Sequence, residues 1–151
     1  MIGKLTELLS RISPPAPGSL PSVYLDFSSV AQRYSTVALR IRNKSDNAVL
    51  VDKLEFIGAD GGQTVDVSGT VVGGAQTLST PVQPHAAGVL DLKGTSFRQV
   101  IQVAGYRGIV KGKIRGHVSG ADTDILWSPP LTIDFAKQTV SYKHAGQKGS
   151  R

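Results

Sequence analysis

The sequence predicts an all-β protein, an antiparallel β-sandwich of about seven strands preceded by a short amphipathic helix. The 151 residues contain 17 Gly, 8 Pro and only 6% aromatic residues, a composition that favours short strands joined by many turns. Residues 37–41 and 109–119 alternate apolar with polar or charged side chains, the period-two pattern of a strand with one buried face. A chain of this length can bury a hydrophobic core without disulfides or metal.

The chain is expected to have three parts: an arm over residues 1–22, a sandwich domain over 23–142 and a basic tail over 143–151. Residues 1–12 have helical spacing of their apolar side chains, and the prolines that follow end this helix and stiffen the spacer. The apolar face consists of Ile2, Leu5, Leu8, Leu9 and Ile12. An isolated helix this short is marginal in water, so we expect it to bind its own domain, a sister subunit or a membrane surface.

Residues 23–27 are predicted to form the first strand, and residues 34–57 a β-hairpin. The five polar residues 43–47 favour a chain reversal after the first half of this segment. In the second half the apolar alternation slips by one position near Asp52 and Lys53, as at a β-bulge or in a strand that changes sheets.

Further strands are predicted over residues 64–72, 88–92, 108–120, 131–135 and 139–142. Residues 95–104 fit two structures. Thr95 can cap a helix that carries Phe97, Val100 and Ile101 on one face, whereas residues 100–103 also suit a strand. We favour one short helix that crosses between the sheets.

Residues 108–120 place glycines at every fourth position on the predicted inner face, which leaves room for bulky neighbours. Trp127 and Phe135 are the candidates for those neighbours. The predicted core contains Leu39, Ile41, Val51, Leu54, Phe56, Ile114 and Trp127.

The outer face of the same strand carries a basic ladder of Lys111, Lys113, Arg115 and His117. Residues 92–120 contain six Lys or Arg and no acid, whereas residues 45–91 contain six acids and one Lys. This asymmetry favours an anionic partner, such as a nucleic acid, lipid headgroups or an acidic protein surface. The alternative is a solvated face whose lysines prevent edge-to-edge pairing. Aromatic side chains are missing from the ladder, which disfavours sequence-specific nucleic-acid recognition.

No pattern of catalytic or metal-binding residues is apparent. The chain has no Cys, its three His are far apart in sequence, and no nucleophile elbow or phosphate-binding loop occurs. Asp122 and Asp124 suit a turn better than a cation site. We therefore expect no enzyme activity, no cofactor, no metal and no small-molecule substrate. With neither a signal peptide nor a membrane-spanning apolar run, a cytoplasmic or virion-associated location is expected.

The order of these elements resembles the late-embryogenesis-abundant type-2 family, whose unit is the water-stress-hypersensitive domain. The likeness covers about residues 23–135. Its points are the short N-terminal helix, a first strand at 23–27, a second strand at 37–43 that ends in Asn before a turn, and an apolar run at 54–56 after the turn. A strand at 67–70, an amphipathic segment at 97–103 and two late strands at 111–118 and 131–135 continue the likeness. The resemblance implies a seven-stranded sandwich without catalytic residues. Immunoglobulin-like and fibronectin-like sandwiches have much the same spacing.

Two classes of function fit these observations. The first is a structural or interaction protein, a subunit of a larger assembly such as a virion or appendage component, held to protein partners or sister subunits by its N-terminal arm. The second is a free-standing stress-protective or ligand-binding module of the kind that the resemblance implies.

Overall fold

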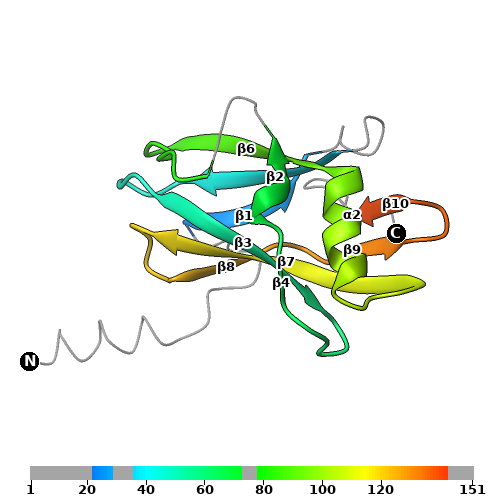
Figure 1. Cartoon of the computed structure of the whole chain (residues 1–151). Helices are drawn as coiled ribbons and strands as arrows, with labels where there is room; N and C mark the ends of the chain where they lie inside the picture. Colours follow the sequence, from blue (N-terminus) through cyan, green and yellow to red (C-terminus); the bar gives the residue numbers. More distant parts are fainter. Residues whose placement is uncertain (1–21, 29–35, 73–77, 143–151) are drawn as a thin grey trace, which may run out of the picture.

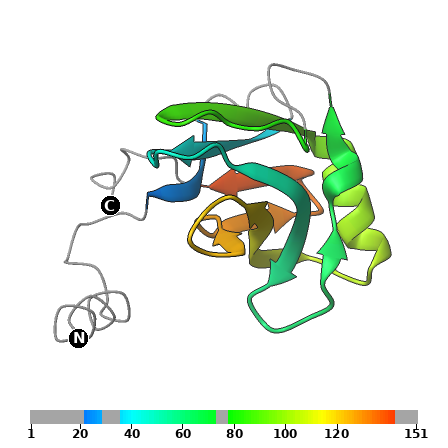
Figure 2. The same cartoon turned by 90° about the vertical axis from the view of Figure 1, so that its left-hand side faces the viewer.

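Two antiparallel sheets, of four and six strands, pack as a sandwich in the computed structural model (Figures 1 and 2), which describes residues 22–28, 36–72 and 78–142. The four-stranded sheet has the order β1 (Val23–Phe27), β2 (Thr36–Asn43), β6 (Ala86–Lys93), β5 (Val71–Val72). The six-stranded sheet has the order β10 (Thr139–Tyr142), β9 (Leu131–Asp134), β7 (Ile109–Ser119), β3 (Leu50–Gly58), β4 (Val65–Asp66), and β8 (Ile125–Trp127) also pairs with β7. The prediction of a mostly β sandwich is confirmed.

One hydrophobic core lies between the two sheets. The inward positions of each strand supply it, so buried and more exposed residues alternate along β2 and β7. Six of the seven predicted core residues are buried: Leu39, Ile41, Val51, Leu54, Phe56 and Ile114.

The predicted hairpin over residues 34–57 is wrong, because its two strands lie in different sheets. β2 pairs with β1 and β6, whereas β3 pairs with β4 and β7. The polar residues 43–47 form a crossover between the sheets. The predicted bulge in the second strand is confirmed, since the register of β3 with β7 shifts between Val51 and Lys53.

The single strand predicted over residues 64–72 is interrupted. β4 belongs to the six-stranded sheet, a 3-10 turn follows at Ser68–Thr70, and β5 belongs to the four-stranded sheet. The Ser68 hydroxyl accepts a hydrogen bond from the backbone amide of Leu54 at 2.9 Å, which holds the turn against β3. Such short strands at crossovers explain why the described residues form ten strands instead of about seven.

The ambiguous residues 95–104 form a helix, α2 (Gly94–Val103), which leads from β6 in one sheet to β7 in the other. Phe97 and Ile101 on its inner face are fully buried, and the ring of Phe97 meets Phe56 edge-on at 6.3 Å. Figure 2 shows α2 covering one side of the sandwich. The predicted crossing helix is thus confirmed.

The prediction that Trp127 belongs to the core is wrong. Leu126 points inward and is 4% exposed, whereas Trp127 points outward and is 49% exposed. The next residue, Ser128, is buried, and its hydroxyl accepts a hydrogen bond from the amide of Ile114 at 2.8 Å. The inward glycines of β7 therefore have other neighbours: Gly112 lies against Phe56 and the carbonyl of Ile57, and Gly116 lies against Leu25, Val51 and Leu54.

Some predictions concern residues outside the described part of the chain. They are the N-terminal helix with Ile2, Leu5, Leu8, Leu9 and Ile12, the proline spacer, and the basic tail over 143–151. Among the described residues, no helix is long and apolar enough to cross a membrane.

Gly112→Ala is expected to lower the free energy of unfolding by about 1–3 kcal/mol, because the new methyl group would collide with the carbonyl of Ile57 and the ring of Phe56. The matched control is Gly69→Ala, whose methyl group meets no atom within 4 Å and should change stability by less than about 0.5 kcal/mol. Urea unfolding of both variants checks this. Equal stability of the two variants would contradict the close packing of β7 on β3.

Candidate functional site on the outer face of the six-stranded sheet

The basic ladder predicted from the sequence does line one face of β7. Lys111 and Lys113 are exposed, and Arg115 and His117 are half-buried, while the alternate residues face the core. The register places Arg115 between Glu55 of β3 and Trp127 of β8. The ladder is therefore part of a polar surface built by three neighbouring strands.

Glu55 is the centre of an ion-pair network on this surface. Its carboxylate Oε1 lies 2.8 Å from Nη2 of Arg115 and 2.6 Å from Nε2 of His117, and Nε of Arg115 donates to the same oxygen at 2.9 Å. Nζ of Lys53 lies 3.4 Å from the other oxygen, Oε2. These neighbours cover the acid so closely that Glu55 is 8% exposed although it points away from the core.

This environment lowers the pKa of the Glu55 carboxyl from its ordinary 4.5 to about 2. The hydrogen bond with His117 is the largest cause, and it outweighs burial, which on its own would raise the pKa. The hydrogen bond and charge of Arg115 and the charge of Lys53 lower the pKa further. Glu55 thus stays ionised at neutral and mildly acidic pH and holds Arg115 in place.

Trp127 completes the surface next to this network. Its ring is 49% exposed, and the guanidinium carbon of Arg115 lies 5.6 Å from the ring centroid, within range of a cation–π interaction. Arg115 is therefore held on one side by a carboxylate and on the other by an indole. The result is an aromatic and cationic surface whose side chains are already ordered.

The structure divides the basic ladder into two halves. Arg115 and His117 are neutralised in part by Glu55, whereas the side chains of Lys111 and Lys113 make no ion pair or hydrogen bond with the part of the chain that the structure describes. Only these two lysines are thus available to an anionic partner at full strength. Anion binding itself stays a prediction.

Sequence reasoning missed Glu55 and placed Trp127 wrongly. A signal for Glu55 was present, because the alternation of Leu54, Glu55 and Phe56 puts the acid on the outer face of its strand. The pairing of β3 with β7, across 60 positions of sequence, was not visible.

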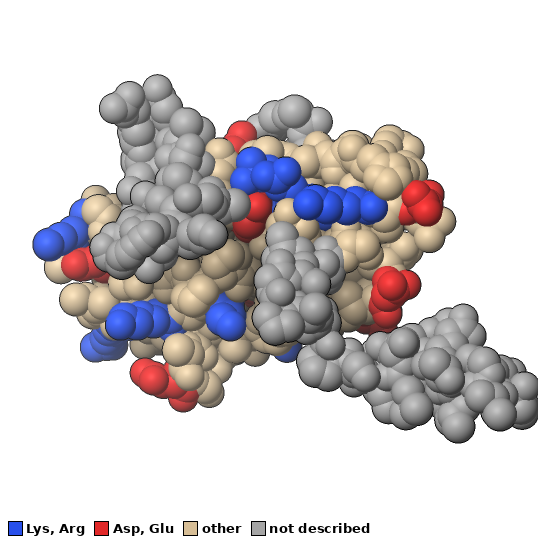
Figure 3. Space-filling view, turned by 180° about the vertical axis from the view of Figure 1, so that it is seen from behind, with Lys and Arg blue, Asp and Glu red and all other residues tan. Residues whose placement is uncertain are grey.

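Elsewhere the charges are mixed. Asp26 on the outer face of the four-stranded sheet pairs with Arg40 at 2.8 Å. Figure 3 shows basic and acidic side chains interspersed on the side of the molecule opposite α2. Within the described ranges, no group of three or more His, Asp or Glu residues could hold a metal ion.

The sequence matches no protein-family model and no curated protein. Among solved structures, the chain is similar to a crystal structure of a protein from Archaeoglobus fulgidus, with 17% identity and a TM-score of 0.31. The match covers 77% of this chain and 97% of that one. A similarity this low bears on neither the fold nor the function.

Glu55→Gln is expected to reduce the dependence of stability on pH in acid. Because the pKa of Glu55 is lower in the folded chain than in the unfolded chain, its charge stabilises the fold above about pH 4.5, and this contribution is lost as the pH falls towards 2. Urea unfolding at a series of pH values should therefore show a shallower decline for the variant than for the wild type over this interval.

The matched control is Asp60→Asn, which removes an exposed carboxylate that has no ion pair among the described residues. This variant should keep the decline of the wild type. If Glu55→Gln instead declined in parallel with the wild type, the network around Glu55 would not contribute to folding.

Proposed function

We propose that this chain is a non-enzymatic interaction protein, a subunit of a larger assembly such as a virion or appendage component. The observation that carries the proposal is the exposed Trp127 beside Arg115, whose position is held by Glu55. Trp and Arg are the residue types that most often dominate the binding energy of protein interfaces. Half of a Trp ring left in water is a cost that a bound partner would remove.

The Arg115 side chain is already held in one position in the free protein, and this supports a role for the surface in binding a partner. Immobilising a long side chain at an interface costs about 0.5–1.5 kcal/mol, and this cost is lower where the side chain is already held in the free protein. Arg115 has two contacts that restrict it, the carboxylate of Glu55 and the ring of Trp127. The surface is thus suited to recognition of a protein partner.

The partner surface is expected to be acidic. Lys111 and Lys113 extend from the same face of β7 at about 6.6–6.8 Å spacing, the repeat of alternate residues on a strand. A strip of acidic side chains on a partner could follow them, and binding would then weaken with salt. A nucleic acid or lipid headgroups would follow the same charges, and an exposed indole also suits base stacking or a lipid interface, so the photo-cross-linking below distinguishes these partners from a protein.

The N-terminal arm over residues 1–22 is the second proposed contact. The apolar helix face predicted from its sequence, and its prolines, suit attachment to a neighbouring subunit. Together, an apolar arm and a polar sheet face would give one chain two separate contacts in an assembly.

Trp127→benzoylphenylalanine is expected to yield one or a few discrete photo-cross-linked adducts with protein when the full chain is produced in its own cells. The matched control carries the same group at Val103, an 81% exposed apolar residue on α2, and should give no discrete adduct. Mass spectrometry of the adduct identifies the partner. With that partner purified, Trp127→Ala should weaken binding by about 2 kcal/mol or more.

Equal labelling at positions 103 and 127 would contradict this proposal. Binding of the identified partner that is unchanged by Trp127→Ala, or by Lys111→Gln with Lys113→Gln at low salt, would contradict the proposed role of those side chains.

The resemblance to the late-embryogenesis-abundant type-2 family suggests the alternative, a free-standing stress-protective or ligand-binding module. It is favoured by α2, a short helix inside a two-sheet sandwich at the place where the resemblance implies an amphipathic segment. A closer kinship with immunoglobulin-like or fibronectin-like sandwiches is a proposal on the same footing.

Size-exclusion chromatography with light scattering distinguishes the two functions. If the arm holds subunits together, the full chain should elute as an oligomer and a chain lacking residues 1–22 as a monomer. A monomer in both cases, with no adduct at position 127, is the result expected for the free-standing module.

A further inference from the structure

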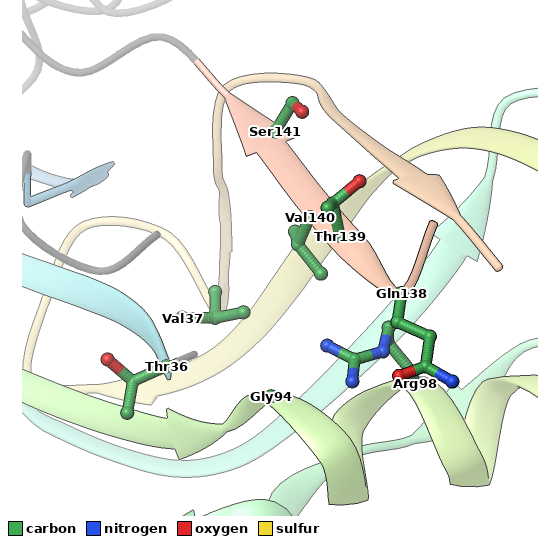
Figure 4. A pocket seen from close by; sticks show the side chains of 8 residues that line it. All are labelled: Thr36, Val37, Gly94, Arg98, Gln138, Thr139, Val140 and Ser141. Atoms are coloured by element: carbon green, nitrogen blue, oxygen red, sulfur yellow. The ribbon is translucent and has the colours of Figure 1, made fainter. Parts of the chain in front are cut away.

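A cavity of about 290 Å³ lies where the two sheets separate at one end of the sandwich, between the start of β2, α2 and the edge strand β10 (Figure 4). Thr36 and Val37 of the four-stranded sheet line one side, and Val140 of the six-stranded sheet lines the other. Gly94 and Arg98 of α2 close it. The size is near the lower end of the range for small-molecule sites.

The lining combines an apolar floor with a single charge. Val37 and Val140 are 1% and 8% exposed, so their side chains form buried walls. In Figure 4 they point towards the cavity from the two sheets, and the guanidinium of Arg98 extends from α2 towards the same space. Thr36, Gln138, Thr139 and Ser141 also belong to the lining residues.

The side chain of Arg98 has no counter-ion among the described residues. None of the described residues that line the cavity is acidic, and the guanidinium of Arg98 makes no hydrogen bond or ion pair with any of the described residues. Arginines on the outer sheet faces differ, because Arg40 pairs with Asp26 and Arg115 with Glu55. The first turn of α2 also contains no acid, so the positive end of the helix adds to the charge of Arg98.

We propose that this cavity binds a small carboxylate that carries a short apolar body. The guanidinium of Arg98 forms the paired hydrogen bonds that a carboxylate accepts. The apolar body packs on the floor of the cavity against Val140, where it leaves water. The proposal is independent of the assembly function, because the cavity lies apart from Trp127 and the basic ladder.

The experiment is a titration of the full chain, labelled with nitrogen-15, with three probes. Hexanoate should cause saturable shifts of the amides of residues 94–98 and 139–141. Hexanol has the same body without the charge and should bind at least about tenfold more weakly, the loss expected for hydrogen bonds to a charged group. Inorganic phosphate, which has the charge without the body, should also bind more weakly than hexanoate.

Variants then test the role of Arg98. Arg98→Gln should weaken hexanoate binding by about tenfold to a hundredfold, and Arg98→Lys by less, because Lys keeps the charge but not the paired geometry. The matched control is Arg107→Gln, which removes an exposed arginine that does not line this cavity and should leave the affinity unchanged. Amides outside the cavity report in the same spectra that each variant is folded.

Three results would overturn the proposal. The first is hexanoate that causes no saturable shift at residues 94–98 and 139–141. The second is a folded Arg98→Gln variant that binds hexanoate as tightly as the wild type. The third is tighter binding of phosphate than of hexanoate, which would show that the apolar walls are not used.

Discussion

The sandwich depends on the buried side chain of Asn43, which stands where the chain leaves one sheet for the other. Asn43 is 1% exposed, and its Nδ2 lies 2.8, 3.0 and 3.1 Å from the carbonyl oxygens of Asn47, Val82 and Gln83. Its Oδ1 accepts hydrogen bonds from the amide and hydroxyl of Ser45. A buried amide without partners costs about 1–3 kcal/mol, so these contacts hold the crossover in one conformation. They also tie the crossover to the segment that leads into β6, the strand that pairs with β2.

Local sequence patterns therefore predicted where the strands lie better than which strands pair with one another. Alternation along residues 37–41 and 109–119 identified β2 and β7, and the slip near Asp52 identified the bulge, because these features depend only on which side chains face inward. A polar turn between two strands usually predicts a hairpin. Here the side chain of Asn43 bonds to residues about forty positions away, and no local pattern contains that information.

The location of Trp127 could not be predicted from its residue type. The alternation of inward and outward positions along the strand determines which face of the sheet it occupies. A large aromatic residue suggests the core, yet Leu126 and Ser128 occupy the inward positions on either side of it. Ser128 is buried where it pairs with Ile114 in both directions: its amide donates to the carbonyl of Ile114 at 2.8 Å, and its hydroxyl accepts from the amide of Ile114 at 2.8 Å. Trp127 must then face outward, where it meets Arg115. The candidate surface could be predicted only in part, since its basic strand was apparent but its aromatic residue and its acid were not.

Acidic and basic residues that are segregated along the sequence form ion pairs in the folded chain. This pairing determines which cationic side chains remain available to a partner. The acidic segment 45–91 contains β3, the basic segment 92–120 contains β7, and the two strands are neighbours, so Glu55 meets Arg115 across them. Cationic residues of β7 form no ion pair where the residue opposite them on the neighbouring strand is not acidic. Lys113 lies opposite Ile57, and Lys111 opposite Thr132. The positive charge open to a partner is thus the part of β7 that its neighbours leave without acids, a property of strand register that net charge alone does not reveal.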